Sequence, residues 1–172
     1  MEYLVIDGYN LINAWNDVFD LENDTLEDCR DKLVNMLSNY QGYKNINVII
    51  VFDAHMVKGS KEKEETFDNI KIVFTKENET ADNYIERFVY KHANDNVIRV
   101  VTSDYLEQRM VLISGGVRVS PRELKEELFR ASKNMESNYS KTERDANPIM
   151  SHLKPDLLEI LEKIRRGIDS EE

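Results

Sequence analysis

The sequence has little that is typical of secreted, membrane-embedded or disulfide-stabilised proteins. Its 172 residues include one cysteine, Cys29, so no disulfide can form within the chain. No apolar run is long enough to cross a bilayer, and no signal peptide is expected because the first residues lead directly into an apolar strand. These features predict a cytoplasmic protein with no membrane partner.

Several functional classes lack the residues they need. The three histidines (His55, His92 and His152) are scattered, so no histidine–cysteine zinc grouping is evident. Glycines spaced GxGxxG are absent, so no nucleotide cofactor is expected. A haloacid dehalogenase-type phosphatase needs a second acid two residues after Asp7, where Tyr9 stands. A response-regulator receiver needs an acidic pair after its first strand and a later lysine, and neither is evident.

The charge balance is acidic. There are 33 Asp and Glu residues against 23 Lys and Arg residues, which gives a formal net charge of −10. This argues against nonspecific binding to nucleic acid. Acids gathered around a cation would contribute to that count without repelling an anionic substrate, so a nucleic-acid partner is disfavoured but not excluded.

The clearest pattern in the chain is an acid that follows each of several short apolar segments. Such segments are typical of buried strands in a parallel sheet. In three cases the acid follows the segment directly: Leu4–Ile6 precedes Asp7, Val48–Phe52 precedes Asp53, and Val97–Ser103 precedes Asp104. In the fourth case, Ile70–Phe74 is followed by Asp82 at the start of the next helix.

Strands that alternate with helices predict a three-layer α/β/α sandwich with a mainly parallel central sheet. Right-handed crossovers place the carboxyl ends of the strands at one rim, where α/β proteins bind ligands, so we expect the four aspartates to meet there. We predict a domain over residues 1–136, a polar linker over 137–154 and an amphipathic helix over 155–168.

Local patterns predict several element boundaries. A helix is expected to begin after Asp24 and to end at Gly42. Residues 54–66 are rich in charge and are expected to form an exposed loop. Thr80 is predicted to cap one helix, and Ser120 to cap another that opens with proline and has glutamate three residues after the cap.

An acidic cluster at the rim would require a cation. Two like charges about 4 Å apart cost roughly 4 kcal/mol at an effective dielectric constant near 20. Oxygen-only ligands favour Mg²⁺ or Mn²⁺ over zinc. A hard cation at an open rim suits hydrolysis of a phosphodiester bond.

We therefore assign hypothetical roles to the polar residues near the rim. Asp7 and Asp82 would be the main metal ligands or water-activating groups, completed by Asp53 and Asp104, with Glu86 as an outer ligand. Orienting hydrogen bonds are assigned to Asn10, Thr80 and Ser103. Contacts with an RNA backbone are assigned to Arg118, Lys58 and Lys61.

Four motifs in this order also carry a resemblance to a known family: Asp7-Gly8-Tyr9-Asn10, Val51-Phe52-Asp53-Ala54, Glu79-Thr80-Ala81-Asp82 and Thr102-Ser103-Asp104. Together they resemble the YacP-like NYN-domain ribonucleases of bacteria, relatives of the PIN-domain nucleases. The resemblance implies a PIN-like fold, metal-dependent cleavage of RNA and leading catalytic roles for Asp7 and Asp82. It further implies association with the ribosome and cleavage of mRNA in the decoding site during translation. The competing hypothesis is a non-catalytic ribosome- or RNA-binding module whose acids are structural.

Overall fold

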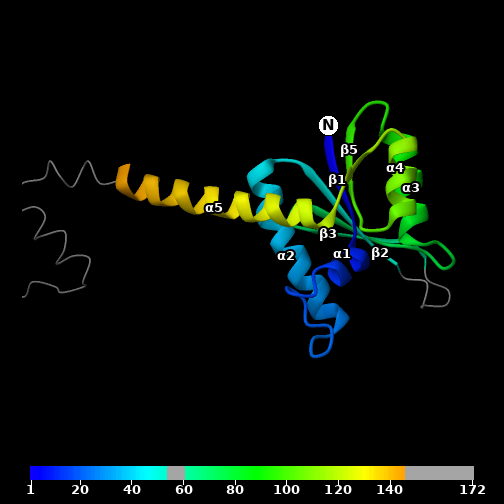
Figure 1. Ribbon diagram of the computed structural model, residues 1–172, viewed down its shortest axis with the longest axis horizontal. Coiled ribbons are helices and arrows are strands. Elements are labelled where there is room, and N and C mark those ends of the chain that lie inside the picture. The colour runs from blue at the N-terminus through cyan, green and yellow to red at the C-terminus, as the bar shows by residue number, and fades with distance from the viewer. Residues whose placement is uncertain (54–60, 146–172) are drawn as a thin grey trace, which may run out of the picture. The chain divides into compact units, whose positions relative to one another are not determined.

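The computed structural model describes residues 1–53 and 61–145, with side chains up to residue 135. The described chain contains a six-stranded sheet in the order β3-β4-β2-β1-β5-β6 (Figure 1). Every neighbouring pair is parallel except β3 and β4. The strands are β1 (Glu2–Asp7), β2 (Asn47–Phe52), β3 (Lys63–Phe67), β4 (Ile70–Phe74), β5 (Val97–Val101) and β6 (Val117–Val119).

Helices cover both faces of this sheet, as the alternating pattern predicts. Helices α3 and α4 pack on one face and α1 and α2 on the other, where the start of α5 also lies (Figure 1). The helices are α1 (Gly8–Ala14), α2 (Leu26–Lys44), α3 (Ala81–His92), α4 (Tyr105–Ile113) and α5 (Pro121–Asp145). The three-layer α/β/α architecture with a mainly parallel sheet is confirmed.

Alternation along the central strands sends side chains into two apolar layers. Val5, Val51 and Val73 belong to the buried layer that contacts α3 and α4, together with Ile85 of α3. Intervening residues such as Ile50 are equally buried and face α1 and α2. The central strands are therefore apolar on both faces, which is why they read as continuous hydrophobic runs.

Two predicted boundaries of α2 are wrong by a few residues. Thr25, not Asp24, is the N-cap, and it forms a reciprocal capping box with Asp28. The helix continues past Gly42 to Lys44 and ends at Asn45, which takes a left-handed conformation with φ of 54°. Asparagine can end a helix in this way as glycine does, because its side chain tolerates the left-handed region. The predicted caps at Thr80 and Ser120 are confirmed.

The expectation of an exposed loop over residues 54–66 is wrong for its last part. Lys63–Phe67 forms the edge strand β3, which pairs with β4 across a two-residue turn at Asp68 and Asn69. Asp68 has a positive φ of 50°, as hairpin turns of this length require. All five residues of β3 are exposed, so the strand has no buried face to reveal it in the sequence. Its charged side chains are typical of an edge strand.

The predicted linker over residues 137–154 is also partly wrong, because α5 continues to Asp145. The chain divides into a first unit, Met1–Ala131, and a second, Ser132–Glu172, and α5 passes from one into the other. The helix expected over residues 155–168 lies outside the described residues. Among the helices of the described chain, none combines the length and the apolar character needed to cross a membrane.

Candidate active site

Asp7 ends β1 and caps α1. Its Oδ1 accepts a hydrogen bond from the backbone N–H of Asn10 at 3.0 Å, which holds the carboxylate at the strand-to-helix junction. Gly8 follows without a positive φ, and its role is close packing. A Cβ atom at this position would lie 2.2 Å from a ring carbon of Phe52, so a larger residue would push the junction away from β2.

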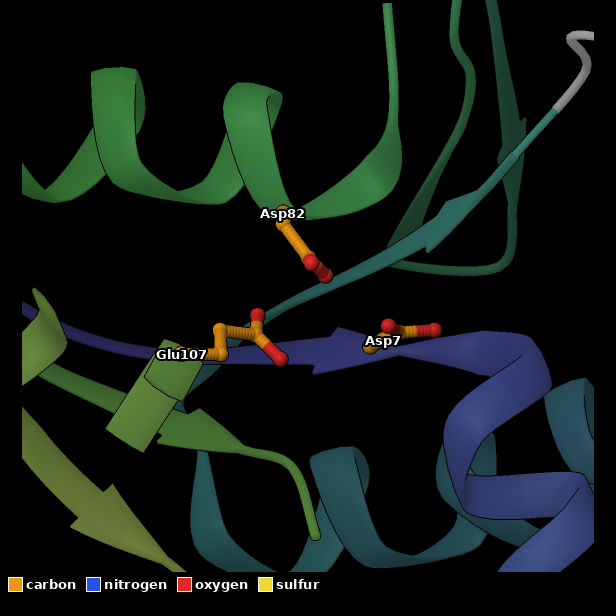
Figure 2. A group of neighbouring side chains, drawn as sticks. All are labelled: Asp7, Asp82 and Glu107. Atoms are coloured by element: carbon orange, nitrogen blue, oxygen red, sulfur yellow. The ribbon is translucent and has the colours of Figure 1, made fainter. Parts of the chain in front are cut away.

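Three carboxylates from three different elements converge beside this junction. Asp7 at the end of β1, Asp82 in the first turn of α3 and Glu107 in the first turn of α4 each offer an oxygen within 4.8 Å of the other two. Figure 2 shows the side chains of Asp82 and Glu107 directed toward the end of β1 where Asp7 lies. In the described part of the chain, this is the group of acids whose spacing could hold a metal ion.

Glu107 is the most deeply enclosed member of this group. It is 5 % exposed, and neither carboxylate oxygen has a hydrogen-bond partner among the described residues. The Thr102 hydroxyl is close enough to lower the pKa of Glu107, against the larger effect of burial, but its geometry falls outside that of a hydrogen bond. A buried, unpaired carboxylate is costly, because it has lost its hydration and gained nothing in return.

The electrostatics of the group follow from this enclosure. Burial raises the pKa of Glu107 to about 8, and repulsion from Asp82 and Asp7 adds to the increase. Burial likewise raises the pKa of Asp7 to about 6. The hydrogen bond from Asn10 lowers this pKa, whereas repulsion from Asp82 and Asp53 raises it further. The pKa of Asp82 is raised by burial, then by Asp104 and Asp53. The pKa values of these three neighbouring carboxylates are therefore all raised above their ordinary values by burial and by like charge.

The other predicted acids lie near this group but outside its compact core. Asp53 and Asp104 are close enough to raise the pKa of Asp82. Asp104 is the N-cap of α4, where its Oδ1 accepts hydrogen bonds from the backbone N–H groups of Leu106 at 2.7 Å and Glu107 at 3.1 Å. Glu86 shares a small pocket of about 110 Å³ with Asp82 and Glu107.

The predicted orienting residues have structural partners. The Asn10 side-chain oxygen accepts hydrogen bonds from both the backbone N–H and the hydroxyl of Ser103, each at 2.8 Å. This contact ties α1 to the loop that leads from β5 into α4. Thr80 caps α3, where its hydroxyl oxygen accepts from the backbone N–H of Asn83 at 3.3 Å. These residues position the elements that carry Asp7, Asp82 and Glu107.

The predicted RNA-contacting cations are dispersed. Arg118 lies on the edge strand β6 and forms an ion pair with Glu123 at 3.4 Å. Lys61 lines a groove between α2 and the β3–β4 hairpin. Lys58 lies outside the described residues.

Glu107 is the residue that sequence reasoning missed. It stands three residues after Asp104, a spacing that resembles an ordinary helix start and therefore attracts no attention. A usable signal lies one turn further on: Val111, at i+4, is buried against the α3 face of the sheet. An acid on the buried side of a helix is rare unless it has a partner or a function.

The mixed α/β fold and the acidic group at the strand ends define a PIN-like domain. Residues 4–166 match the YacP-like NYN domain family, and the chain belongs to that family. Membership indicates a nuclease-type function.

Matches to YacP of Bacillus subtilis illustrate the relationship. The protein named "Uncharacterized protein YacP" from strain 168 is 41% identical over 172 residues, which covers 97% of this chain and 98% of that protein. The crystal structure of Rae1 (YacP) matches with a TM-score of 0.69 at 39% identity, covering 97% of this chain and 96% of that one. A single-substitution variant of the same protein matches with a TM-score of 0.71 at 37% identity and the same coverage.

Proposed function

We propose that this protein is a divalent-metal-dependent endoribonuclease that cleaves phosphodiester bonds of mRNA. The observation that carries the proposal is the enclosed carboxylate of Glu107, which lacks any hydrogen-bond partner in the described chain and meets Asp7 and Asp82 within 4.8 Å. A group of acids alone could be incidental. A buried acid with no partner, directed at two others, is the arrangement expected where a cation belongs.

The donor set fits a hard cation. All three side chains offer oxygen, which suits Mg²⁺ or Mn²⁺. The three side chains, each with an oxygen within 4.8 Å of the other two, would hold the ion between them. Such an ion would polarise the phosphoryl oxygen, activate water and offset developing negative charge.

The protein's own groups would divide the remaining work. Asp7 and Asp82 are the more accessible carboxylates, and we assign them the contacts nearest to the substrate and the attacking water. Glu107 would hold the cation from the enclosed side. Asn10, through Ser103, would fix the distance between α1 and α4, while Asp53 and Asp104 would keep the surrounding potential negative until a cation enters.

The acidic net charge bears on how the RNA substrate reaches the site. A formal net charge of −10 disfavours capture of free RNA, so a large partner that presents the strand is the better source of substrate. The family resemblance supports the ribosome as that partner, with mRNA cut in the decoding site during translation. A cytoplasmic location is consistent with this role.

The test compares the wild type with Asp7→Asn, Asp82→Asn and Glu107→Gln. Cleavage of a defined mRNA is followed in a translating extract and, separately, with naked RNA. Divalent ions are withheld only in the assay with naked RNA, because translation itself requires Mg²⁺. We expect metal-dependent cleavage by the wild type and its loss in each folded variant. Folded variants that cut as fast as the wild type would remove the roles proposed for these three residues. Absence of cleavage by the wild type would overturn the proposal in favour of a non-catalytic binding module. Cleavage of naked RNA that is indifferent to translation would remove only the ribosome from it.

A further inference from the structure

A groove on the opposite face of the sheet has no role in the chemistry described above. It lies between α2 and the β3–β4 hairpin and encloses about 410 Å³, within the range of small-molecule sites. Its floor contains the aromatic rings of Phe52 and Phe74, and Arg30, Lys61 and Lys63 supply cations along its walls.

The planar guanidinium of Arg30 is held in this groove by two aromatic rings and a hydrogen bond. The carbon of its guanidinium lies 5.9 Å from the ring centre of Phe52 and 5.6 Å from that of Phe74. Its Nη1 donates a hydrogen bond to the hydroxyl of Tyr9 at 3.2 Å. Within the described ranges, no carboxylate forms an ion pair with Arg30. A guanidinium fixed by rings and by a neutral hydroxyl keeps its charge available to a ligand.

Residues that line or support the groove adjoin residues of the acidic site in the sequence. Tyr9 stands two residues after Asp7, and its ring lies 5.1 Å from that of Phe52. Phe52 is the last residue of β2 and immediately precedes Asp53. The close approach of Gly8 to Phe52 fixes this junction. A strand of RNA that crosses the rim at the end of β1 would therefore pass from the three carboxylates to Arg30.

The charge of the groove favours a nucleobase over a bare phosphate. Its three cations are matched by three acids, Glu27, Asp31 and Glu65, and Lys63 forms an ion pair with Glu65. The groove is thus close to neutral overall, in contrast to the acidic molecule around it. Flat aromatic and guanidinium surfaces in such a setting are the platforms on which unpaired bases stack.

We propose that this groove binds a nucleobase of the RNA strand next to the scissile bond, with the base stacked on the guanidinium of Arg30. The proposal rests on the proposed function for its substrate class. It adds a positioning subsite that anchors the strand on the α2 face while the phosphodiester lies at Asp7, Asp82 and Glu107. Lys61 would lie beside the backbone of the same nucleotide.

The test measures binding without cleavage. In an Asp82→Asn background, fluorescence anisotropy would follow a short labelled single-stranded RNA and a set of copies with one abasic position each. Stacking of one base contributes about 1–3 kcal/mol, so we expect Arg30→Lys to weaken binding of the intact RNA roughly fivefold to 150-fold. Lysine keeps the positive charge but lacks the planar guanidinium on which a base can stack. The matched control is Arg122→Lys, an exposed arginine that pairs with Glu126 on α5 and should bind RNA unchanged.

The abasic series separates stacking from charge. One abasic position should weaken binding by the same factor as Arg30→Lys, and combining the two changes should cost nothing further. Equal weakening of intact and abasic RNA by Arg30→Lys would indicate a phosphate contact and overturn the proposal. So would wild-type-like affinity of Arg30→Lys, or the absence of saturable binding to the parent protein.

A second measurement avoids any change in the groove. An RNA carrying 4-thiouridine at the position found above would be cross-linked to the Asp82→Asn protein, and we expect the attached peptide to contain Tyr9, Phe52 or Phe74. Attachment only elsewhere would overturn the subsite. The two proposals fail separately: Arg30-dependent binding without any cleavage by the wild type would refute the nuclease alone, and metal-dependent cleavage with Arg30-independent binding would refute the groove alone.

Discussion

Two groups of charged side chains lie on opposite faces of the same sheet and differ in how their charges are satisfied. On the α2 face, Glu127 accepts a hydrogen bond from Arg99 at 2.5 Å and another from the Tyr40 hydroxyl at 2.7 Å. Burial alone would raise the pKa of Glu127, but these bonds outweigh it and the pKa is lowered. On the α3 face, Asp7 and Glu107 have no cationic partner among the described residues, and burial raises the pKa of both.

This difference in pairing suggests that the first group stabilises the fold and that the second has a functional role. A partly buried acid that is paired and hydrogen-bonded supports the fold, and its removal leaves a cation uncompensated. A buried acid beside other acids opposes the fold unless something from outside completes it. We therefore interpret the Arg99–Glu127–Tyr40 network as structural and the Asp7–Asp82–Glu107 group as the candidate site of the proposed cation.

The largest expected contrast is in activity. Glu107→Gln should lower RNA cleavage by about 100-fold or more, the scale on which removal of a catalytic group acts. The matched change on the other face, Glu127→Gln, should leave most of the activity in place. Initial cleavage rates of the two variants are measured in the same translating extract. Equal losses of activity would contradict the assignment of function to one group and stability to the other.

The second contrast is in the pH dependence of stability without divalent ions. The folded-state pKa values of Asp7, about 6, and Glu107, about 8, exceed their ordinary values of 3.8 and 4.5. The folded protein therefore keeps protons that the unfolded chain has released, so the free energy of unfolding should fall between about pH 4 and pH 8, by at most about 8 kcal/mol. Urea titrations across this range measure it.

A divalent ion should reverse part of that loss. Mn²⁺ at about 100 times its dissociation constant at pH 8 would stabilise the folded state by about 2.7 kcal/mol. The same Mn²⁺ concentration should stabilise the protein less at pH 5, because fewer carboxylates are ionised to bind it. Stability that rises from pH 5 to pH 8 in a chelator, with no response to Mn²⁺, would contradict the description of the α3 face.

A third contrast concerns the stability of the two isosteric variants. Glu127→Gln should lower the free energy of unfolding by about 1–3 kcal/mol, because its bond to Arg99 loses a charge. Glu107→Gln at pH 8 without metal should cost less, since it also removes like-charge repulsion. Denaturant midpoints of the two variants provide the comparison, and a larger loss for Glu107→Gln would point to a structural role for that carboxylate.

The smallest expected effect comes from Asn10. Asn10→Ala removes the acceptor of two hydrogen bonds from Ser103 and should cost about 1 kcal/mol of stability, with a cleavage loss below that of Glu107→Gln. Asn35→Ala is the control, because its exposed amide only donates to a carbonyl of its own helix. An Asn10 variant as inactive as Glu107→Gln would require a direct contact between Asn10 and the substrate.

The sequence was sufficient to predict the sheet and one end of the site because both depend on local patterns. Apolar runs that stop at Asp7, Asp53 and Asp104 predicted strands whose ends share a rim, and Thr80 predicted the start of α3. Strand β3 was not predicted because it has no buried face and therefore no apolar pattern in the sequence. It is held by its pairing with β4.

The missing parts of the site depend on tertiary position. Glu107 looks like a common helix-start acid, and only the packing of α4 against the sheet shows that it is enclosed and unpaired. Arg30 appears as one charge on an amphipathic helix until the fold places it over Phe52 and Phe74, which come from two other elements. Such relations cannot be read from spacing along one segment.

The most direct test of the central claim is to locate the cation. Crystals grown with Mn²⁺ at pH 8 would be measured at a wavelength where manganese scatters anomalously. We predict a single strong anomalous peak bounded by oxygens of Asp7, Asp82 and Glu107, which disappears in Glu107→Gln crystals. A peak elsewhere, or none at this site with saturating Mn²⁺, would contradict the proposal that these three carboxylates bind a metal ion.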